Sequence, residues 1–403
     1  MKIMLEVQGK YNSAKIFAET VDDVTIGQVI EMCNQKSFGD GQIRIMPDCH
    51  AGKGSVVGTT IQVGEAVVPN VVGVDIGCGM LTTKLKNVKS IDFNVLDEVI
   101  RKFVPHGFNV NQKSHQFIKK VPIDNLKCLK ELKNLNRIEL SLSSLGGGNH
   151  FIELNVDDSG EHYLVIHSGS RNLGKQIAEL YQEKAIESLY VSKDEIQLAI
   201  DALKAEGRFQ EIASTISNMK GRKTEQVPNE LAFLTGEQRE AYLHDMNIAQ
   251  IFASYNRKAM TETIFRHMGW EIEEQFETIH NYIDIEKNML RKGAVSAEKD
   301  EVILIPMNMR DGSILAVGKG NEDWNHSAPH GAGRLMSRKK AKENITFADF
   351  EQTMKNVWSS SVTEHTIDES PFAYKPMEQI VRAIEPTATI SKYLKPVYNF
   401  KSS

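Results

Sequence analysis

The sequence predicts an α/β fold, in the broad sense that includes α+β arrangements, within one large domain spanning residues 1–403. Two observations favour this class. Strand-like runs rich in glycine and β-branched residues fill the first part of the chain and return at 294–320. Between them, from about 173 to 267, apolar residues recur at helical spacing with few helix breakers. Because strand-like pieces flank the helical stretch, we expect one interleaved domain with a mainly helical insertion at 173–267.

The individual elements follow from local patterns. The runs "GSVVGTTIQV" (54–63), "AVVPNVVGVDIG" (66–77) and "YLVIHSGS" (163–170) are typical of buried strands separated by turns. The stretches at 174–207 and 238–268 supply the helical insertion. A last helical region is expected after residue 330, where "NITFADFEQ" offers a start resembling a helix cap.

Bulk composition limits the class of protein. With 403 residues, 41% of them hydrophobic, and a formal net charge of −5, the chain can bury a large core and has no global attraction to nucleic acid. An RNA or DNA partner must therefore meet a local basic patch. The amino terminus does not resemble a signal peptide, no apolar run approaches the roughly 18 residues of a membrane span, and the four cysteines are too scattered for a disulfide framework. We expect a soluble cytoplasmic protein.

The run "GVDIGCGM" is the first candidate for chemistry. Asp75 and Cys78 lie three residues apart, so in a regular strand their side chains would point to opposite faces. Gly77 and Gly79 let the backbone bend so that both can face one metal site. A buried cysteine beside a turn-forming aspartate explains this fragment equally well. A thiolate ligand alone fits zinc as readily as manganese.

Four histidines lie among glycine, asparagine or serine residues: His150, His167, His280 and His330. Any one of them alone is more often structural, but ligands from many distant segments together indicate a preformed pocket. Asp48, in "MPDCHAGKGS", either orients a ligand from behind or serves a turn. The pattern of a phosphate-binding P-loop is incomplete there, and neither CxxC pairs nor GxSxG occurs.

The stretch "SAPHGAGRLMSRKKAK" (327–342) places His330 before two glycines and a run of basic residues. Glycines allow close approach to a ligand, and Arg334 and Arg338 suit phosphate oxygens. For Lys339 and Lys340, a solvated helix face is the better interpretation. The turn is therefore a candidate phosphate site with His330 at its mouth.

Taken together, these stretches resemble the RtcB family of RNA-splicing ligases, which join RNA 3′-phosphate or 2′,3′-cyclic phosphate ends to 5′-hydroxyl ends. The matching segments occur in the family's order, between residues 46 and 401. They are "MPDCHAGKGS", "VVGVDIGCGM", "GGGNHFIE", "HSGSR", "HNY", "RKGAVSA", "HGAGRLMSR" and a carboxy-terminal "FK". The resemblance implies a single domain with central mixed or antiparallel sheets surrounded by helices.

The resemblance also implies GTP and two Mn²⁺ ions as cofactors. Asp75 and His150 would bind one ion, His167 and His280 the other, and the Cys78 thiolate would bridge both. His330 would be the nucleophile that takes up GMP. The positions implied to contact GTP are Asn149, His150, Phe151, Ile152, Glu153, His280, Asn281, Pro306, Met307, Asn308, Met309, Ser313, His330, Gly331, Ala332, Gly333 and Lys401. Those implied to meet RNA or phosphate are Arg171, Lys292, Arg334 and Arg338, with Asp48 behind the ligands.

The chain departs from the family pattern in places. It has "PMNMRDGS" (306–313) where "PGSMG" is frequent, Pro329 where serine is common, and "FKSS" in place of a terminal lysine–glycine. These differences indicate a divergent paralogue, for RNA repair or for tRNA splicing. The expected partners are RNA with the ends described above and an activating accessory protein. Two alternatives stay open: a metal-dependent phosphoesterase acting on RNA ends without guanylylation, and a non-catalytic protein that binds RNA ends.

Overall fold

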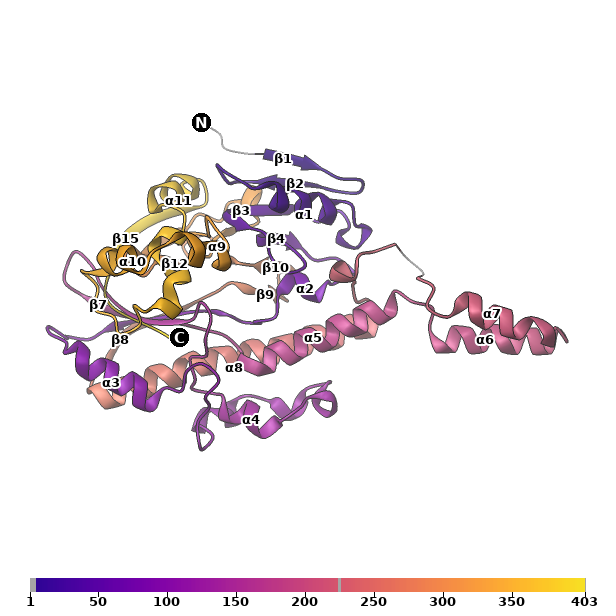
Figure 1. Cartoon of the computed structure of the whole chain (residues 1–403), viewed down its shortest axis with the longest axis horizontal. Helices are drawn as coiled ribbons and strands as arrows, with labels where there is room; N and C mark the ends of the chain where they lie inside the picture. Colours follow the sequence, from indigo (N-terminus) through magenta and orange to yellow (C-terminus); the bar gives the residue numbers. More distant parts are fainter. Residues whose placement is uncertain (1–4, 224–225, 403) are drawn as a thin grey trace.

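A computed structural model describes residues 5–223 and 226–402, and two β-sheets form its centre (Figure 1). The first sheet has six strands in the order β1-β2-β3-β4-β10-β9, and only the β2–β3 pair is parallel. Its strands are β1 (Leu5–Gln8), β2 (Ser13–Ile16), β3 (Ile43–His50), β4 (Val57–Gln62), β9 (Asn281–Asp284) and β10 (Met289–Lys292).

The second sheet has seven strands in the order β12-β13-β15-β6-β7-β5-β8, and every neighbouring pair is antiparallel. Its strands are β5 (Gly79–Leu85), β6 (Phe151–Val156), β7 (His162–Ser168), β8 (Ile272–Ile279), β12 (Val302–Asn308), β13 (Gly312–Gly318) and β15 (Ala388–Lys401). A two-stranded ribbon joins β11 (Ala294–Ser296) to β14 (Ser327–Pro329).

Helices cover the sheets, and the long helices α5 and α8 run side by side along one side of the body (Figure 1). The α-helices are α1 (Asp23–Cys33), α2 (Pro69–Val72), α3 (Phe93–Phe103), α4 (Leu135–Leu140), α5 (Arg171–Ser188), α6 (Lys193–Ala205), α7 (Ile212–Met219), α8 (Gly236–Met268), α9 (Arg338–Asn344), α10 (Phe347–Met354) and α11 (Met377–Ile384). Short 3₁₀ turns are η1 (Lys36–Phe38), η2 (Gln116–Lys120), η3 (Ile123–Asn125), η4 (Leu129–Glu131), η5 (Phe209–Glu211), η6 (Asn229–Leu231), η7 (Glu322–Trp324), η8 (Glu364–Glu369) and η9 (Pro371–Ala373).

Two hydrophobic clusters position α8 against both sheets. One joins strands of the first sheet to α5 and to the amino-terminal half of α8, with Phe252 at its centre. The other joins β6, β7 and β15 to α3 and to the carboxy-terminal half of α8, through Met260 and Ile264. Since one helix contributes to both cores, α8 fixes the relative placement of the two sheets.

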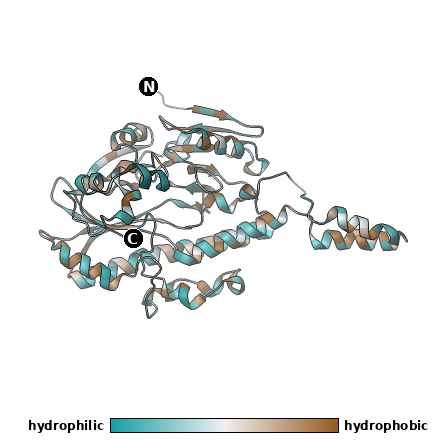
Figure 2. Ribbon diagram, in the orientation of Figure 1, coloured by the Kyte–Doolittle hydropathy of each residue, from teal (hydrophilic) through white to brown (hydrophobic). Residues whose placement is uncertain are grey.

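The helices α6 and α7 pack on each other and project from the body as a hairpin (Figure 1). A complete capping box starts α6, because Ser192 accepts from the Glu195 backbone while the Glu195 carboxylate accepts from that of Ser192. The hairpin mixes hydrophobic with hydrophilic residues (Figure 2), and Leu198 is 69% exposed.

The α/β fold class predicted from the sequence is confirmed, with one local correction. The expected strands at 54–63, 163–170 and 294–320 are present as β4, β7 and β11–β13, and Thr346 caps α10 as "NITFADFEQ" predicted. The prediction of a strand at 66–77 is wrong, because residues Pro69–Val72 form α2. Proline fixes φ at a helical value and occupies the first position of this helix, so it begins a helix there. None of the described helices is long and apolar enough to cross a membrane.

Candidate metal centre and nucleotide cavity

The loop between α2 and β5 bends so that the Asp75 and Cys78 side chains face one region. Gly77 makes this bend with a φ of +71°, which favours glycine. The fully buried Arg257 of α8 anchors the loop, since its Nη1 donates to the carbonyl oxygens of Gly77 at 2.8 Å and Ser168 at 2.7 Å. The loop geometry is therefore set by a helix far away in sequence.

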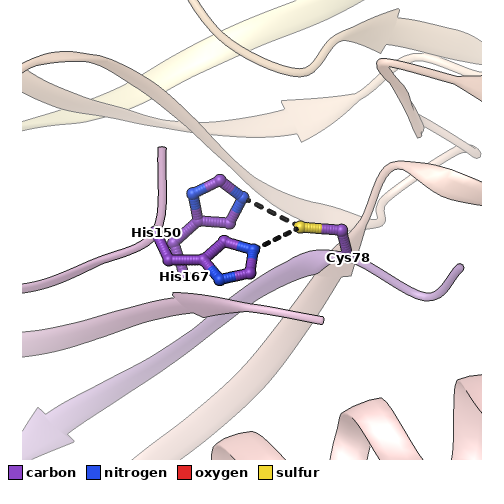
Figure 3. Close-up of side chains that lie close together, drawn as sticks. All are labelled: Cys78, His150 and His167. Carbon is purple, nitrogen blue, oxygen red and sulfur yellow. Dashed lines mark hydrogen bonds between the residues drawn. The ribbon is translucent and has the colours of Figure 1, made fainter. Parts of the chain in front are cut away.

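Cys78, His150 and His167 converge on one buried point (Figure 3). The Cys78 Sγ lies 3.2 Å from His167 Nε2 and 3.5 Å from His150 Nε2. Two further groups extend this cluster: the Asp75 carboxylate lies 2.9 Å from His150 Nε2, and His280 Nε2 lies 3.3 Å from His167 Nε2. The five side chains come from the α2–β5 loop, the start of β6, β7 and the β8–β9 junction.

Backbone carbonyls select the histidine tautomers. His150 Nδ1 lies 2.8 Å from the Leu145 oxygen and His167 Nδ1 lies 3.2 Å from the Asn149 oxygen, so each Nδ1 must carry the proton and donate it. Nε2 is then the nitrogen of each ring that faces the cluster. Without a cation, His150 Nε2 can donate to the Asp75 carboxylate, and a bound cation would take the place of that proton. Several acceptors directed at one buried point fit a bound cation, which makes this donor set suitable for a metal.

The protonation states of this cluster depend on burial. Burial, followed by the charge of Asp75, holds the pKa of the Cys78 thiol well above its usual value. Burial and then the neighbouring imidazole of His150 hold the pKa of His167 well below its usual value, which keeps that ring neutral. Burial raises the pKa of Asp75, but the hydrogen bond and charge of His150 outweigh it, so that carboxyl stays ionised. A cation that binds here must displace the thiol proton.

His330 lies beside this cluster, and its ring centroid is 4.9 Å from that of His280. Its Nδ1 lies 2.6 Å from Asp48 Oδ2, which also accepts from the backbone N–H groups of His330 and Gly331 at 3.1 and 3.2 Å. Asp48 is fully buried on β3. The carboxylate therefore orients the ring and fixes the Nδ1–H tautomer, which leaves the Nε2 lone pair available.

A cavity of about 240 Å³ opens next to His330. Most residues expected to contact GTP line it, and so do two of the four expected to meet phosphate. They are Asn149, Phe151, Glu153, His280, Pro306, Met307, Asn308, Met309, His330, Gly331, Ala332, Gly333 and Lys401, with Arg334 and Arg338.

Four positions in the expected GTP set do not line this cavity, and one of them, His150, belongs to the cluster described above. Ile152 alternates with Phe151 and Glu153 along β6, so its side chain points into the hydrophobic core on the other face of the sheet. Ser313 is buried on β13 beside the cavity, and its hydroxyl has no partner among the described residues. Asn281 and the metal-cluster residues Asp75 and Cys78 line a second cavity of about 280 Å³.

This second cavity shares His50, Asn149, His280 and His330 with the first. The four side chains therefore stand between the first cavity and the cluster of candidate metal ligands. His50 carries no expectation from the sequence beyond its Gly-containing turn. It is partly buried, and its Nδ1 lies 3.1 Å from the Asp48 carbonyl oxygen.

The four residues expected to meet phosphate differ in how many protein partners their charged groups already have. Arg171 lies beside the metal cluster with its Nη1 3.5 Å from His150 Nδ1. Lys292 is buried, and its ammonium donates to Ser55 Oγ at 2.8 Å and to three backbone carbonyls. Burial lowers the pKa of Lys292 to about 7. Arg334 and Arg338 both pair with Glu369, at 3.5 and 3.1 Å.

Glu369 is the residue of the candidate site that the sequence patterns missed most clearly. This buried carboxylate binds the Lys401 ammonium at 2.6 Å and accepts from the Tyr374 hydroxyl at 2.8 Å, in addition to its arginine contacts. Burial raises the pKa of Glu369, but the charges of Lys401 and Arg338 bring it below its usual value. The segment "DESPFAYK" offered one signal, two adjacent acids before a proline.

Comparisons with known proteins agree with this arrangement. The family described as tRNA-splicing ligase RtcB matches residues 30–131 and 94–402. The RNA-splicing ligase RtcB of Escherichia coli (strain K12) is 32% identical over 380 residues, covering 85% of each chain. The tRNA-splicing ligase RtcB of Nanoarchaeum equitans (strain Kin4-M) is 24% identical over 467 residues, covering 92% of this chain and 90% of its own. RNA-splicing ligase RtcB2 of Escherichia coli (strain ATCC 25922) is 24% identical over 386 residues, covering 89% and 87%.

Proposed function

The chain belongs to the RtcB family, and from that premise we propose that it is an RNA ligase that uses GTP and two Mn²⁺ ions. It joins an RNA 3′-phosphate or 2′,3′-cyclic phosphate end to a 5′-hydroxyl end through a GMP adduct on His330. The observation that carries this proposal is the placement of His330. Its ring stands between the cavity lined by most positions expected to contact GTP and the cluster of candidate metal ligands.

The donor set supports the metal part of the proposal. Asp75 and His150 would hold one ion and His167 and His280 the other, with the Cys78 sulfur between them. When bound, paired cations neutralise phosphate charge and favour the attack of one group and the departure of another. Manganese in preference to zinc comes from the family resemblance.

The chain's own groups supply the nucleophile. Asp48 holds the Nδ1–H of His330, so Nε2 is the attacking atom. Attack on the α-phosphorus of GTP forms a P–N bond and releases pyrophosphate. The RNA 3′-phosphate then takes the guanylate from His330, and the 5′-hydroxyl displaces GMP to form the phosphodiester.

The nucleotide cavity supports a purine ligand with hydrogen-bond donors on its edge. Glu153, at the floor of the cavity, accepts from Asn155 at 3.0 Å and from Asn399 at 2.7 Å. A carboxylate held in this way can also accept from the N–H groups on the edge of guanine. Lys401 lies nearby with its ammonium 5.6 Å from the Phe151 ring centroid. We assign Glu153 and Lys401 to the base, and Arg334 and Arg338 to phosphate or RNA.

An RNA sealing assay tests the function. The substrates are one strand with a 3′-phosphate and one with a 5′-hydroxyl, incubated with GTP and Mn²⁺. The ligase reaction predicts a joined product that requires GTP and that His330→Ala abolishes. Release of inorganic phosphate from the 3′ end without joining would instead identify a phosphoesterase. Retention of unaltered RNA, weakening as salt rises, would identify a non-catalytic binder.

A further inference from the structure

A second candidate binding surface lies on the outer side of α8, away from the nucleotide cavity. A cavity of about 590 Å³ opens there between α8, η2 and the start of β8. We call it the α8 groove and define it by Phe117, Lys120, Tyr255, Lys258, Arg266 and Trp270. Its size falls within the range of about 300–1,000 Å³ that is usual for ligand sites.

The groove is built on one stripe of α8. Tyr255, Lys258, Glu262 and Arg266 follow one another at spacings of three and four residues, which places them on one helix face. Arg257 points the other way, because it lies about 200° around the helix from Tyr255 and binds the Cys78 loop. The groove is thus on the opposite side of α8 from the metal cluster, about 10–12 Å across the helix.

Lysine ammonium groups lie over the faces of two aromatic rings of the α8 groove. The Lys120 ammonium lies 4.7 Å from the Phe117 ring centroid and 5.6 Å from that of Tyr255, and the Lys258 ammonium lies 5.7 Å from the latter. The Phe117 and Tyr255 planes are tilted by 59°, so the two rings do not stack on each other. At the other end, Trp270 meets Phe265 edge to face.

The charge of the groove is positive. Lys120, Lys258 and Arg266 form no ion pair with any described residue, whereas the single lining carboxylate, Glu262, accepts a hydrogen bond from Gln116 at 3.0 Å. The acidic residues Glu271 and Glu273 at the start of β8 are already paired with Lys86 and Lys84. The three cations outnumber the one carboxylate, so the lining side chains keep a net positive charge that attracts an anion.

We propose that the α8 groove binds single-stranded RNA. Its aromatic faces suit stacked bases and its free cations suit the phosphates between them, which is the combination found in sequence-tolerant strand binders. The ammonium groups now over the rings can move to phosphates while bases take their place. The lining cations outnumber the one lining carboxylate, so the groove favours a polyanion such as RNA over a neutral protein surface. The inference rests on RNA being the substrate of the proposed ligase.

Binding of an RNA that cannot be sealed tests this directly. The probe is a fluorescent single strand of about 12 nucleotides with a 5′ label and a 3′-hydroxyl, measured by anisotropy with the full chain. Tyr255→Ala is expected to weaken binding about tenfold, and Tyr255→Trp to retain it. Tyr393→Ala is the matched control, because Tyr393 is an exposed tyrosine elsewhere on the surface.

The salt dependence gives a second readout. Lys120→Ala combined with Lys258→Ala should reduce the slope of log affinity against log salt by about 1.4, since two phosphate contacts are lost. Lys204→Ala combined with Lys395→Ala, two exposed lysines outside the groove, should leave the slope unchanged. These surface substitutions should not disturb folding, which thermal melting can verify.

Two outcomes would overturn the inference. One is wild-type affinity and salt slope in all groove variants. The other is a change in sedimentation of the variants with RNA affinity intact, which would make the groove an interface between copies of this chain. Guanylylation at His330, measured in the same proteins, separates this from the proposed function. If labelling fails everywhere while groove variants still lose RNA, the ligase proposal is wrong and the groove stands.

Discussion

At the scale of single residues, the site depends on which nitrogen of each histidine carries the proton. His150 and His167 donate from Nδ1 to backbone carbonyls, and His330 donates from Nδ1 to Asp48. All three rings therefore direct Nε2 into the site, the first two toward Cys78 and the third toward the cavities. The same Nδ1–H tautomer thus suits His150 and His167 as ligands and His330 as a nucleophile.

The central thiol is expected to control both metal ions. Cys78→Ser replaces a sulfur that faces His150 and His167 with a poorer ligand, so the purified protein should lose both ions together. Metal content by mass spectrometry measures this. Cys33→Ser, at a buried cysteine in the hydrophobic core, serves as the control and should keep both ions. A Cys78→Ser protein with full metal content would contradict the bridging role.

The carboxyl group of Glu153 should make stability depend on pH. Burial raises its pKa to about 7, although Asn399, Asn155 and Lys401 act against this. The folded state then holds a proton that the unfolded state releases above its ordinary pKa of 4.5, so folding stability falls as pH rises from about 5 to 7. The effect is about 3 kcal/mol at most.

Glu153→Gln removes this titration. The free energy of unfolding is measured in urea without nucleotide. Between pH 5 and pH 8 it should decrease less in the variant than in the wild type. If the free energy of unfolding changed with pH in the same way in both proteins, the pKa of Glu153 would not be raised in the folded state.

The candidate metal ligands can be predicted from the sequence, whereas the residues that hold the site together cannot. Cys78, His150, His167 and His330 stand in glycine-bearing motifs and His280 stands before an asparagine, which is a local signal. Arg257 and Glu369 act through contacts with residues 180 and 32 positions away, at Gly77 and Lys401. Such contacts arise only from tertiary packing, and a basic or acidic residue in a helix or turn gives no local sign of them.

At the scale of elements, α8 supports the candidate metal centre. Its inner face holds the Cys78 loop through Arg257 and packs closely under Gly77. The sequence predicts this helix from its spacing of apolar residues, yet not the two cores it joins. The misassigned strand at 66–77 has the same origin: a buried valine-rich run fits a strand or a short helix, and only the position of Pro69 separates them.

Gly77→Ala should therefore damage both the fold and the site. An added Cβ would lie 2.9 Å from the Gln250 Cα and 3.0 Å from the Ala253 Cβ, and the residue has a φ of +71°. We expect a loss of about 1–3 kcal/mol in the free energy of unfolding. Gly64→Ala is the matched control, because a Cβ there meets nothing within 4 Å. Equal urea midpoints for the two variants would contradict the close packing of α8 against the loop.

At the scale of the whole molecule, the functional parts gather in the body formed by the two sheets, while the α6–α7 hairpin stands apart (Figure 1). The hairpin leaves the body where Tyr190 and Lys223 form an isolated antiparallel β-bridge. Beside it, the Val191 backbone N–H donates to the Arg222 carbonyl oxygen at 3.0 Å. The sequence predicts a helical insertion, but the projection of its middle part depends on where α5 and α8 bury their apolar faces. We propose that the hairpin is an appendage on a single domain.

Removal of the hairpin tests that proposal. Residues 192–221 can be replaced by Gly-Gly, because the chain already closes between Val191 and Arg222. We expect the melting temperature to change by no more than about 2–4 °C, the equivalent of roughly 1 kcal/mol. Calorimetry measures this. Aggregation or a much lower melting temperature would show that the hairpin belongs to the core.

In the proposed reaction His330, oriented by Asp48 beside the candidate metal ligands, carries the guanylate. The most direct measurement is incubation with α-labelled GTP and Mn²⁺, followed by denaturation and mapping of the label on the polypeptide. We expect an adduct that is labile in acid and stable in alkali, located on His330, absent from His330→Ala and reduced in Asp48→Asn. Label at another residue, or undiminished label in His330→Ala, would contradict the account.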